Sequence, residues 1–171
     1  MNPMQQIRIE KVTLNIGAGK DQAKLEKGMA LIKAVAGVEP VKTVTNKRIA
    51  AWGLRPGLPI GCKLTLRKLS ALQLLERLFV AKEKVVKPEN FDDFGNLSFG
   101  IPEYIDIPGV TYDPKIGVLG LQVCVTLEKA GYRVKRRKRS PCRIPKRHAV
   151  TRQDAMSFFQ KNFGLKIEGA A

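Results

Sequence analysis

Two β-like segments around a basic loop, at residues 40–69, constrain this chain more than any other feature. The outgoing segment, 62–69, alternates cationic or hydroxyl side chains with apolar ones, which predicts a strand with one polar and one apolar face. The loop combines Lys and Arg with Trp52 and with Pro and Gly residues typical of turns. Such a face and loop suit a nucleic-acid backbone, because cations bind phosphates and an aromatic ring stacks on an unpaired base. The alternative is a solvated hairpin whose Trp52 packs into the core.

The formal net charge of +16 over 171 residues indicates the class of partner. A chain of this length most often forms one domain with a hydrophobic core. So large a charge repels itself and attracts polyanions, which argues against a free-standing metabolic enzyme and favours nucleic acid or an anionic membrane surface. The apolar runs are too short to span a bilayer, and the N-terminus lacks the apolar core of a signal peptide. We therefore expect a cytoplasmic protein.

The cysteines and the single histidine argue against a metal site. Cys62, Cys124 and Cys142 are widely spaced without a C-x-x-C pair, and His148 is the one other soft ligand. We expect no metal, no cofactor and no disulfide framework, with Cys62 and Cys124 as small core residues in a reducing compartment. An enzyme acting on RNA is a second hypothesis, but it would need a convergent acid–base or metal set. A peripheral membrane protein is a third, but the basic run 133–147 lacks amphipathic periodicity.

The first part of the chain predicts a strand, a turn and a helix. Segment 7–16 alternates as a strand, with a change of side between Ile9 and Val12 that indicates a β-bulge or an earlier start. The Gly-Ala-Gly-Lys stretch at 17–20 lacks the spacing of a P-loop and the Ser or Thr after its Lys. It is typical of a tight turn, whose backbone amides can face an RNA phosphate. Segment 21–36 has the periodicity of an amphipathic helix, with Asp21 near its N-terminal cap and Gly37 as its C-terminal stop.

Three further elements follow from local patterns. Ser70 followed by Gln73 is a capping-box pattern, which predicts a helix over 71–83. Segment 118–127 is rich in β-branched residues and predicts a central strand. A last helix begins near Thr151 and carries three phenylalanines at core spacing. That spacing favours anchoring of the helix, with base stacking as the alternative.

Two segments stand apart by charge. Residues 88–113 contain six acidic side chains and no Lys or Arg, so we expect them to face solvent or a basic protein. A metal or acid–base pair at Asp92 and Asp93 is conceivable, but adjacent carboxylates in a loop with Gly and Asn are typical of solvated turns. Residues 131–152 contain ten Lys and Arg and no acid, which predicts an extended arm, ordered on RNA or mobile without it. A nuclear-targeting signal is the alternative explanation of the KRRKR run.

Three stretches together resemble one family. They are VTLNIGAGK at 12–20, RPGLPIGCKLTLRK at 55–68 and FGIPEYIDIPGVTYD at 99–113. In this order, along nearly the whole chain, they are similar to large-subunit ribosomal protein five, which binds 5S ribosomal RNA in the central protuberance. The short N-terminus and the basic arm with its final helix resemble the archaeal and eukaryotic branch.

The resemblance implies an α+β fold, a two-layer sandwich in which an antiparallel-rich sheet carries helices on one face and RNA on the other. A single domain, 1–171, would comprise an α/β core at 1–130, a basic arm at 131–150 and a C-terminal helix at 151–164. The implied role is structural and not enzymatic. The protein would help to fix 5S RNA into the large subunit of the cytoplasmic ribosome, without a membrane.

The resemblance, together with the charge of the arm, implies three sets of contact residues. Those for ribosomal RNA are Asn15, Gly17, Thr43, Thr45, Lys63, Thr65, Arg67, Arg136, Arg137 and Arg139. Those for the peptidyl-site transfer RNA, in the loop 46–55, are Asn46, Lys47, Arg48, Trp52 and Arg55. Those for a basic small-subunit protein across an intersubunit bridge are Asp92, Asp93, Glu103, Asp106 and Asp113. Further expected partners are large-subunit ribosomal RNA and the neighbouring proteins of the 5S particle.

Overall fold

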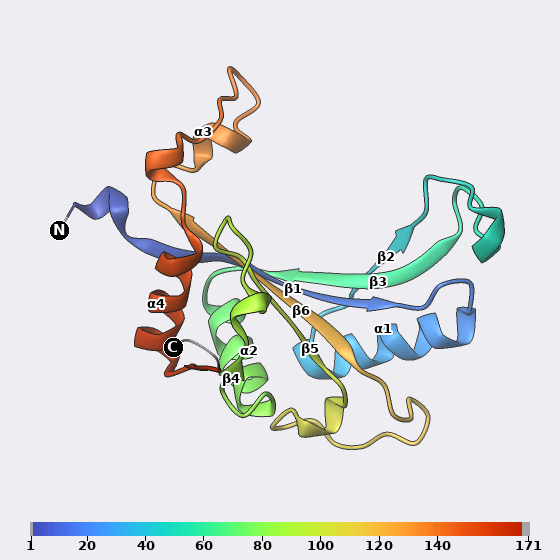
Figure 1. Ribbon diagram of the computed structural model, residues 1–171. Coiled ribbons are helices and arrows are strands. Elements are labelled where there is room, and N and C mark those ends of the chain that lie inside the picture. Colours follow the sequence, from blue (N-terminus) through green and yellow to red (C-terminus); the bar gives the residue numbers. More distant parts are fainter. Residues whose placement is uncertain (1, 169–171) are drawn as a thin grey trace.

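A five-stranded sheet in the order β2-β3-β1-β6-β5 is the centre of the computed structural model, which describes residues 2–168 (Figure 1). Every neighbouring pair in this sheet is antiparallel. Its strands are β1 (Ile7–Gly17), β2 (Val41–Val44), β3 (Pro59–Leu66), β5 (Leu97–Ile101) and β6 (Leu121–Lys129). A separate parallel pair of two-residue strands, β4 (Val85–Val86) and β7 (Lys166–Ile167), ties the middle of the chain to its C-terminal part.

Helices α1 (Gln22–Ala36) and α2 (Lys68–Ala81) pack against one face of this sheet (Figure 1). α4 (Arg152–Phe163) packs beside α2, and the short α3 (Arg133–Arg136) lies in the basic arm. Single 3-10 turns occur at Pro3–Gln5, Ala50–Trp52, Pro88–Asn90, Tyr104–Asp106 and Lys146–His148. This arrangement confirms the expected α+β fold.

The bulge predicted in the first strand is present in β1. The register of β1 against β6 shifts between Ile9 and Lys11, which leaves Glu10 as the extra residue. Because of that extra residue, Ile9 and Val12 both turn toward the helices, and Val12 is completely buried. Glu10 therefore has no partner in the register with β6, and its carboxylate can contact another element.

The last helix is capped and anchored as its sequence predicts. The amide of Asp154 donates to the Thr151 hydroxyl (3.2 Å), and the amide of Thr151 donates to the Asp154 carboxylate (3.3 Å). Phe159 is completely buried, with its ring centroid 5.9 Å from that of Phe79 and 6.0 Å from that of Phe91. These aromatic contacts attach α4 to α2 and to the segment before β5.

The predicted capping box at Ser70 is wrong. α2 begins at Lys68, directly after β3, and no side chain caps its first turn. Lys68 turns the chain with a φ of 57°, so Ser70 already lies inside the helix. Within this helix Leu72 is 37% exposed, whereas Leu75 is completely buried.

Two expectations about burial also need correction. β5 lies within the acidic segment 88–113, and its Leu97 is completely buried, so that segment does not face solvent throughout. Cys62 is buried in the core as predicted, but Cys124 is only half-buried. The alternate residues of β6, such as Val123, fill the core, so Cys124 must point to the other face of the sheet.

Candidate nucleic-acid interface

Within the described chain, no helix lies across the middle of the sheet face opposite α1 and α2, which we call the open face (Figure 1). Its residues follow from the strand register, because paired residues of neighbouring strands point to the same side. They are Lys11, Thr13, Asn15 and Gly17 of β1, Val41 and Thr43 of β2, Lys63 and Thr65 of β3, Ser98 and Gly100 of β5, and Gln122, Cys124 and Thr126 of β6. The middle of the open face is thus mostly polar and carries lysines. The acidic side chain that the register places on this side is Glu128, which pairs with Arg8 at the end next to the basic arm.

Strand pairing brings several predicted contact residues together on this face. Asn15 is paired with Lys63 on one side and with Gln122 on the other. Nδ2 of Asn15 donates to the side-chain oxygen Oε1 of Gln122 (3.0 Å). Thr13 stands opposite Thr65. Residues that are far apart in the sequence therefore form one band of hydrogen-bonding groups with a cation beside it.

A glycine allows the strands to crowd at the edge of this band. Gly61 of β3 pairs with Gly17 on one side and with Thr43 on the other. A Cβ atom at Gly61 would lie 2.7 Å from the carbonyl oxygen of Ile16 and 3.1 Å from the Thr43 hydroxyl. A larger residue would therefore push the strands apart.

The loop between β2 and β3 is folded on itself. Ile49 and Leu54 exchange backbone hydrogen bonds of 3.1 and 3.0 Å around the single 3-10 turn. Trp52 at the tip is 67% exposed, so the alternative in which it packs into the core is wrong. Thr45, in contrast, is buried. Its hydroxyl donates to the carbonyl of Lys47 (3.0 Å), so Thr45 stabilises the start of the loop.

The cations and the amide side chain predicted for this loop are exposed. These residues are Asn46, Lys47, Arg48 and Arg55. The loop and the basic arm both rise on the open side of the sheet, at opposite ends of it (Figure 1). The open face therefore lies between two projections that carry positive charge.

The turn after β1 does not offer its amides to a ligand. The amides of Ala18 and Gly19 both donate to the carbonyl of Ile60, at 2.9 and 3.0 Å. The prediction that this turn presents these backbone amides to a phosphate is therefore wrong for both of them. Its contribution is to hold the end of β1 against β3.

The basic arm is folded at its base by contacts with the rest of the protein. The Tyr132 hydroxyl accepts from the amide of Val150 (2.9 Å) and donates to the carbonyl of His148 (3.3 Å). Nε2 of His148 donates to the carbonyl of Ala130 (2.7 Å). These contacts attach the base of the arm to the rest of the protein, and the expectation of an arm that is ordered on RNA or mobile without it stays a prediction.

Within the arm, the arginines differ in their surroundings. Arg136 forms ion pairs with Glu10 (2.6 Å) and Glu128 (2.5 Å). Arg137 and Arg139 are exposed, and no salt bridge within residues 2–168 involves either of them. The guanidinium of Arg136, expected at RNA, is thus bound to protein carboxylates.

Two family models match this chain. The family model for ribosomal protein L5 matches residues 2–55, and the model for the C-terminal part of the same ribosomal family matches residues 59–158. The chain belongs to the ribosomal protein L5 family.

Several similar relatives of this L5-family chain are archaeal. It is 44% identical over 168 residues to the large ribosomal subunit protein uL5 of Sulfurisphaera tokodaii, covering 98% of this chain and 95% of that one. It is 46% identical over 167 residues to uL5 of Nanoarchaeum equitans, covering 97% and 98%, and 46% identical over 167 residues to uL5 of Pyrobaculum aerophilum, covering 98% and 93%. The chain is therefore a structural protein of the large ribosomal subunit in its archaeal form, from a family that is not known to be enzymatic.

The acidic segment of this L5-family chain contains a turn built around one carboxylate. Asp92 accepts hydrogen bonds from the amides of Phe94 (3.0 Å) and Asn96 (2.6 Å), and from the Asn96 side chain (2.6 Å). This geometry agrees with the turn interpretation of Asp92 and Asp93. The other carboxylates predicted for a protein contact are Glu103 and Asp106, which are exposed, and Asp113, which is half-buried.

Nothing in the described part of this L5-family chain suggests a metal or a membrane span. Among residues 2–168, no three His, Cys, Asp or Glu side chains gather in a way that would hold a metal ion. The same residues include no helix that is both long and apolar enough to cross a membrane.

Burial raises the pKa of the Cys62 thiol, which keeps it protonated inside the core.

Sequence reasoning missed several open-face residues. The sequence predicts Cys124 in the core and Gln122 in a central strand, and it gives no signal for Lys11 or Thr13, yet the register places all four on the open face. The alternation of β6 contains the necessary signal, because its polar members share one face. Which face that is follows only from the pairing of β6 with β1.

Proposed function

We propose that this L5-family chain binds 5S ribosomal RNA on its open face and helps to hold that RNA in the large subunit. The observation that carries the proposal is an exposed sheet face with lysines and hydrogen-bonding side chains, flanked by two basic projections and backed by a packed core. Phosphate neutralisation would supply most of the affinity, and RNA shape most of the specificity.

The chemistry of the open face divides between phosphate and ribose or base groups. Lys63 and the exposed Arg67 after β3 are suited to phosphates. Asn15 and Thr65 offer hydrogen-bonding groups suited to ribose hydroxyls and base edges. Gly17 has open space where a Cβ would lie, so RNA can approach the backbone closely there.

The β2–β3 loop is proposed to contact the peptidyl-site transfer RNA. Its exposed indole offers a stacking plane, and the cations around it offer phosphate contacts. A loop held by its own backbone hydrogen bonds presents these groups without a large ordering cost on binding.

The acidic segment is proposed to contact a basic small-subunit protein across an intersubunit bridge. Its exposed carboxylates lie in a chain of otherwise positive charge, which favours a basic partner over RNA. The buried β5 and the turn around Asp92 hold this segment against the sheet.

The experiment compares two double variants with the same loss of charge. Lys63→Ala with Arg67→Ala should weaken binding to archaeal 5S RNA and reduce the slope of log affinity against log salt by about 2, roughly 1 for each lost phosphate contact. Lys47→Ala with Arg48→Ala should leave 5S binding nearly unchanged and slow translation in a reconstituted system. If the loop variant damaged 5S binding more than the sheet variant did, the proposed division of roles would be wrong.

A further inference from the structure

A cluster of two carboxylates and two arginines joins the basic arm to the sheet. Glu128 of β6 is 5% exposed and accepts from Arg8 of β1 (2.7 Å) and from Arg136 of α3 (2.5 Å). The other end nitrogen of Arg136 reaches Glu10 (2.6 Å). One guanidinium thus bridges two carboxylates on neighbouring strands, and charge-assisted pairs of this kind are the strong class of hydrogen bond.

Strand pairing and the arm bring this cluster together. Arg8 and Glu128 are partners across β1 and β6, and Glu10 is the extra residue of the bulge, two positions after Arg8. Arg136 reaches both carboxylates, although it lies 126 residues from Glu10 along the chain. The cluster fixes α3 at the end of the open face that lies away from the β2–β3 loop (Figure 1).

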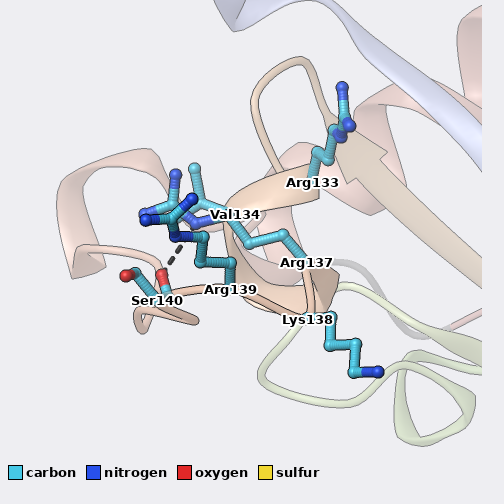
Figure 2. Close-up of a pocket in the computed structure, with 6 residues that line it drawn as sticks. All are labelled: Arg133, Val134, Arg137, Lys138, Arg139 and Ser140. Atoms are coloured by element: carbon cyan, nitrogen blue, oxygen red, sulfur yellow. Dashed lines mark hydrogen bonds between the residues drawn. The ribbon is translucent and has the colours of Figure 1, made fainter.

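Beyond this anchor, the arm forms a hollow with cationic walls. It is lined by Arg133, Val134, Arg137, Lys138, Arg139 and Ser140 (Figure 2). The side chains of Arg137 and Arg139 extend to one side of the arm, whereas those of Arg133 and Lys138 point away from them (Figure 2). The hollow contains no carboxylate, so its guanidinium groups repel each other unless an anion joins them.

The turn that closes the hollow is held by one of these arginines. Nε of Arg137 donates to the carbonyl of Ser140 (2.7 Å), and Ser140 adopts a left-handed φ of 49°. The amide of Cys142 donates to the carbonyl of Val134 (3.2 Å), which joins the two ends of segment 134–142. Nε of Arg137 is thereby occupied, and its two terminal nitrogens remain to bind an acceptor such as a phosphate.

We propose that the hollow of Arg137 and Arg139 is a phosphodiester site for RNA, and that Arg136 is its positioning residue, held by Glu10 and Glu128 instead of touching the RNA. Planar guanidinium groups suit the paired oxygens of a phosphate. The proposal rests on the proposed RNA-binding function and adds a second contact, outside the open face. It also assigns a structural purpose to two of the few carboxylates in a strongly basic chain.

The first experiment tests the hollow in the full-length protein. The probe is a 12-base-pair RNA duplex of arbitrary sequence, bound over a range of salt concentrations. Arg137→Gln with Arg139→Gln should reduce the salt slope by about 2. The control, Lys27→Gln with Lys33→Gln on the exposed side of α1, removes the same charge and should change the slope little. Equal effects of the two variants would overturn the phosphate site.

The second experiment separates positioning from simple electrostatics. Glu10→Gln with Glu128→Gln raises the net charge from +16 to +18, so electrostatics alone predicts tighter binding of the duplex. Positioning by Arg136 predicts weaker binding, with a salt slope lower by about 1 to 2. Hydrogen exchange at the amide of Cys142 should become faster as well. Tighter binding with unchanged exchange would overturn the positioning role.

Two controls keep these outcomes interpretable. Glu26→Gln with Glu39→Gln adds the same charge at exposed positions away from the arm, and it should tighten binding slightly. Unchanged hydrogen exchange in the central strands would show that each variant is folded. Failure of the open-face variant to affect 5S binding would count against the proposed function, whereas failure of the arm variants would count against this inference alone.

Discussion

Replacing Phe159 by Ala tests whether the aromatic cluster of α4 anchors the helix or serves RNA. The ring is completely buried, and its centroid lies 5.5 to 6.0 Å from those of four other phenylalanines. Truncation of such a side chain costs about 3–5 kcal/mol, from lost transfer free energy and the cavity that remains. That is a large share of the roughly 5–15 kcal/mol that stabilises an ordinary domain.

Urea and thermal denaturation measure this loss. For a chain of this size, each kcal/mol lowers Tm by about 2–4 °C, so the variant should melt about 6–20 °C lower. Phe94→Ala is the matched control, because Phe94 is 74% exposed and its removal should cost less than about 0.5 kcal/mol. The folded fraction of the Phe159 variant should bind 5S RNA with unchanged affinity. A stability loss below about 1 kcal/mol together with weakened RNA binding would refute the anchoring role.

Two further predictions concern α4 and the turn before β5. Burial alone would raise the pKa of Asp154, but hydrogen bonds from Lys129 and the capping threonine bring that pKa below its ordinary value. Its contribution, about 0.5 kcal/mol for a carboxylate this exposed, is therefore complete above about pH 4 and is lost as the pH falls through the lowered pKa. Asp154→Asn should cost stability at pH 7 and much less at pH 3 in urea titrations. Gly95→Ala should cost about 2–4 kcal/mol, because φ is 75° and the new Cβ would lie 2.5 Å from a Val150 methyl. Gly117→Ala, with φ of 73° and open space, should cost only the backbone strain of about 1–2 kcal/mol in the same assay.

Local patterns in the sequence predict most of the elements and one side of the interface. The alternation around Lys63 and Thr65 places both on an exposed face, and the capping box at Thr151 marks the start of α4 within a residue. The change of side after Ile9 indicates the bulge. Each of these signals lies within a few residues along the chain, where steric and hydrogen-bonding preferences act directly.

What the sequence does not reveal depends on distant pairing. The sequence does not reveal β5, because a strand of five residues, from Leu97 to Ile101, is too short to show a clear alternation within an acidic segment. The open-face position of Gln122 follows from its pairing with Asn15, 107 residues away. Arg136 reads as one more cation in a basic run, since its two carboxylate partners lie elsewhere in the chain. Local charge density therefore predicts the class of ligand better than it predicts which cations reach that ligand.

The placement of carboxylates explains how a chain of this charge keeps one face cationic and still has an ordered arm. Within strands β1 to β6 of the large sheet, the acidic side chains are Glu10 and Glu128, and both pair with arginines at the same end. Their charge is neutralised where the arm begins, so it does not oppose phosphates at Lys63. The guanidinium of Arg136 bridges the two carboxylates, which lie on neighbouring strands. One arginine of the arm therefore neutralises the acidic side chains of the sheet and attaches the arm to it, while Arg137 and Arg139 have no salt bridge within residues 2–168.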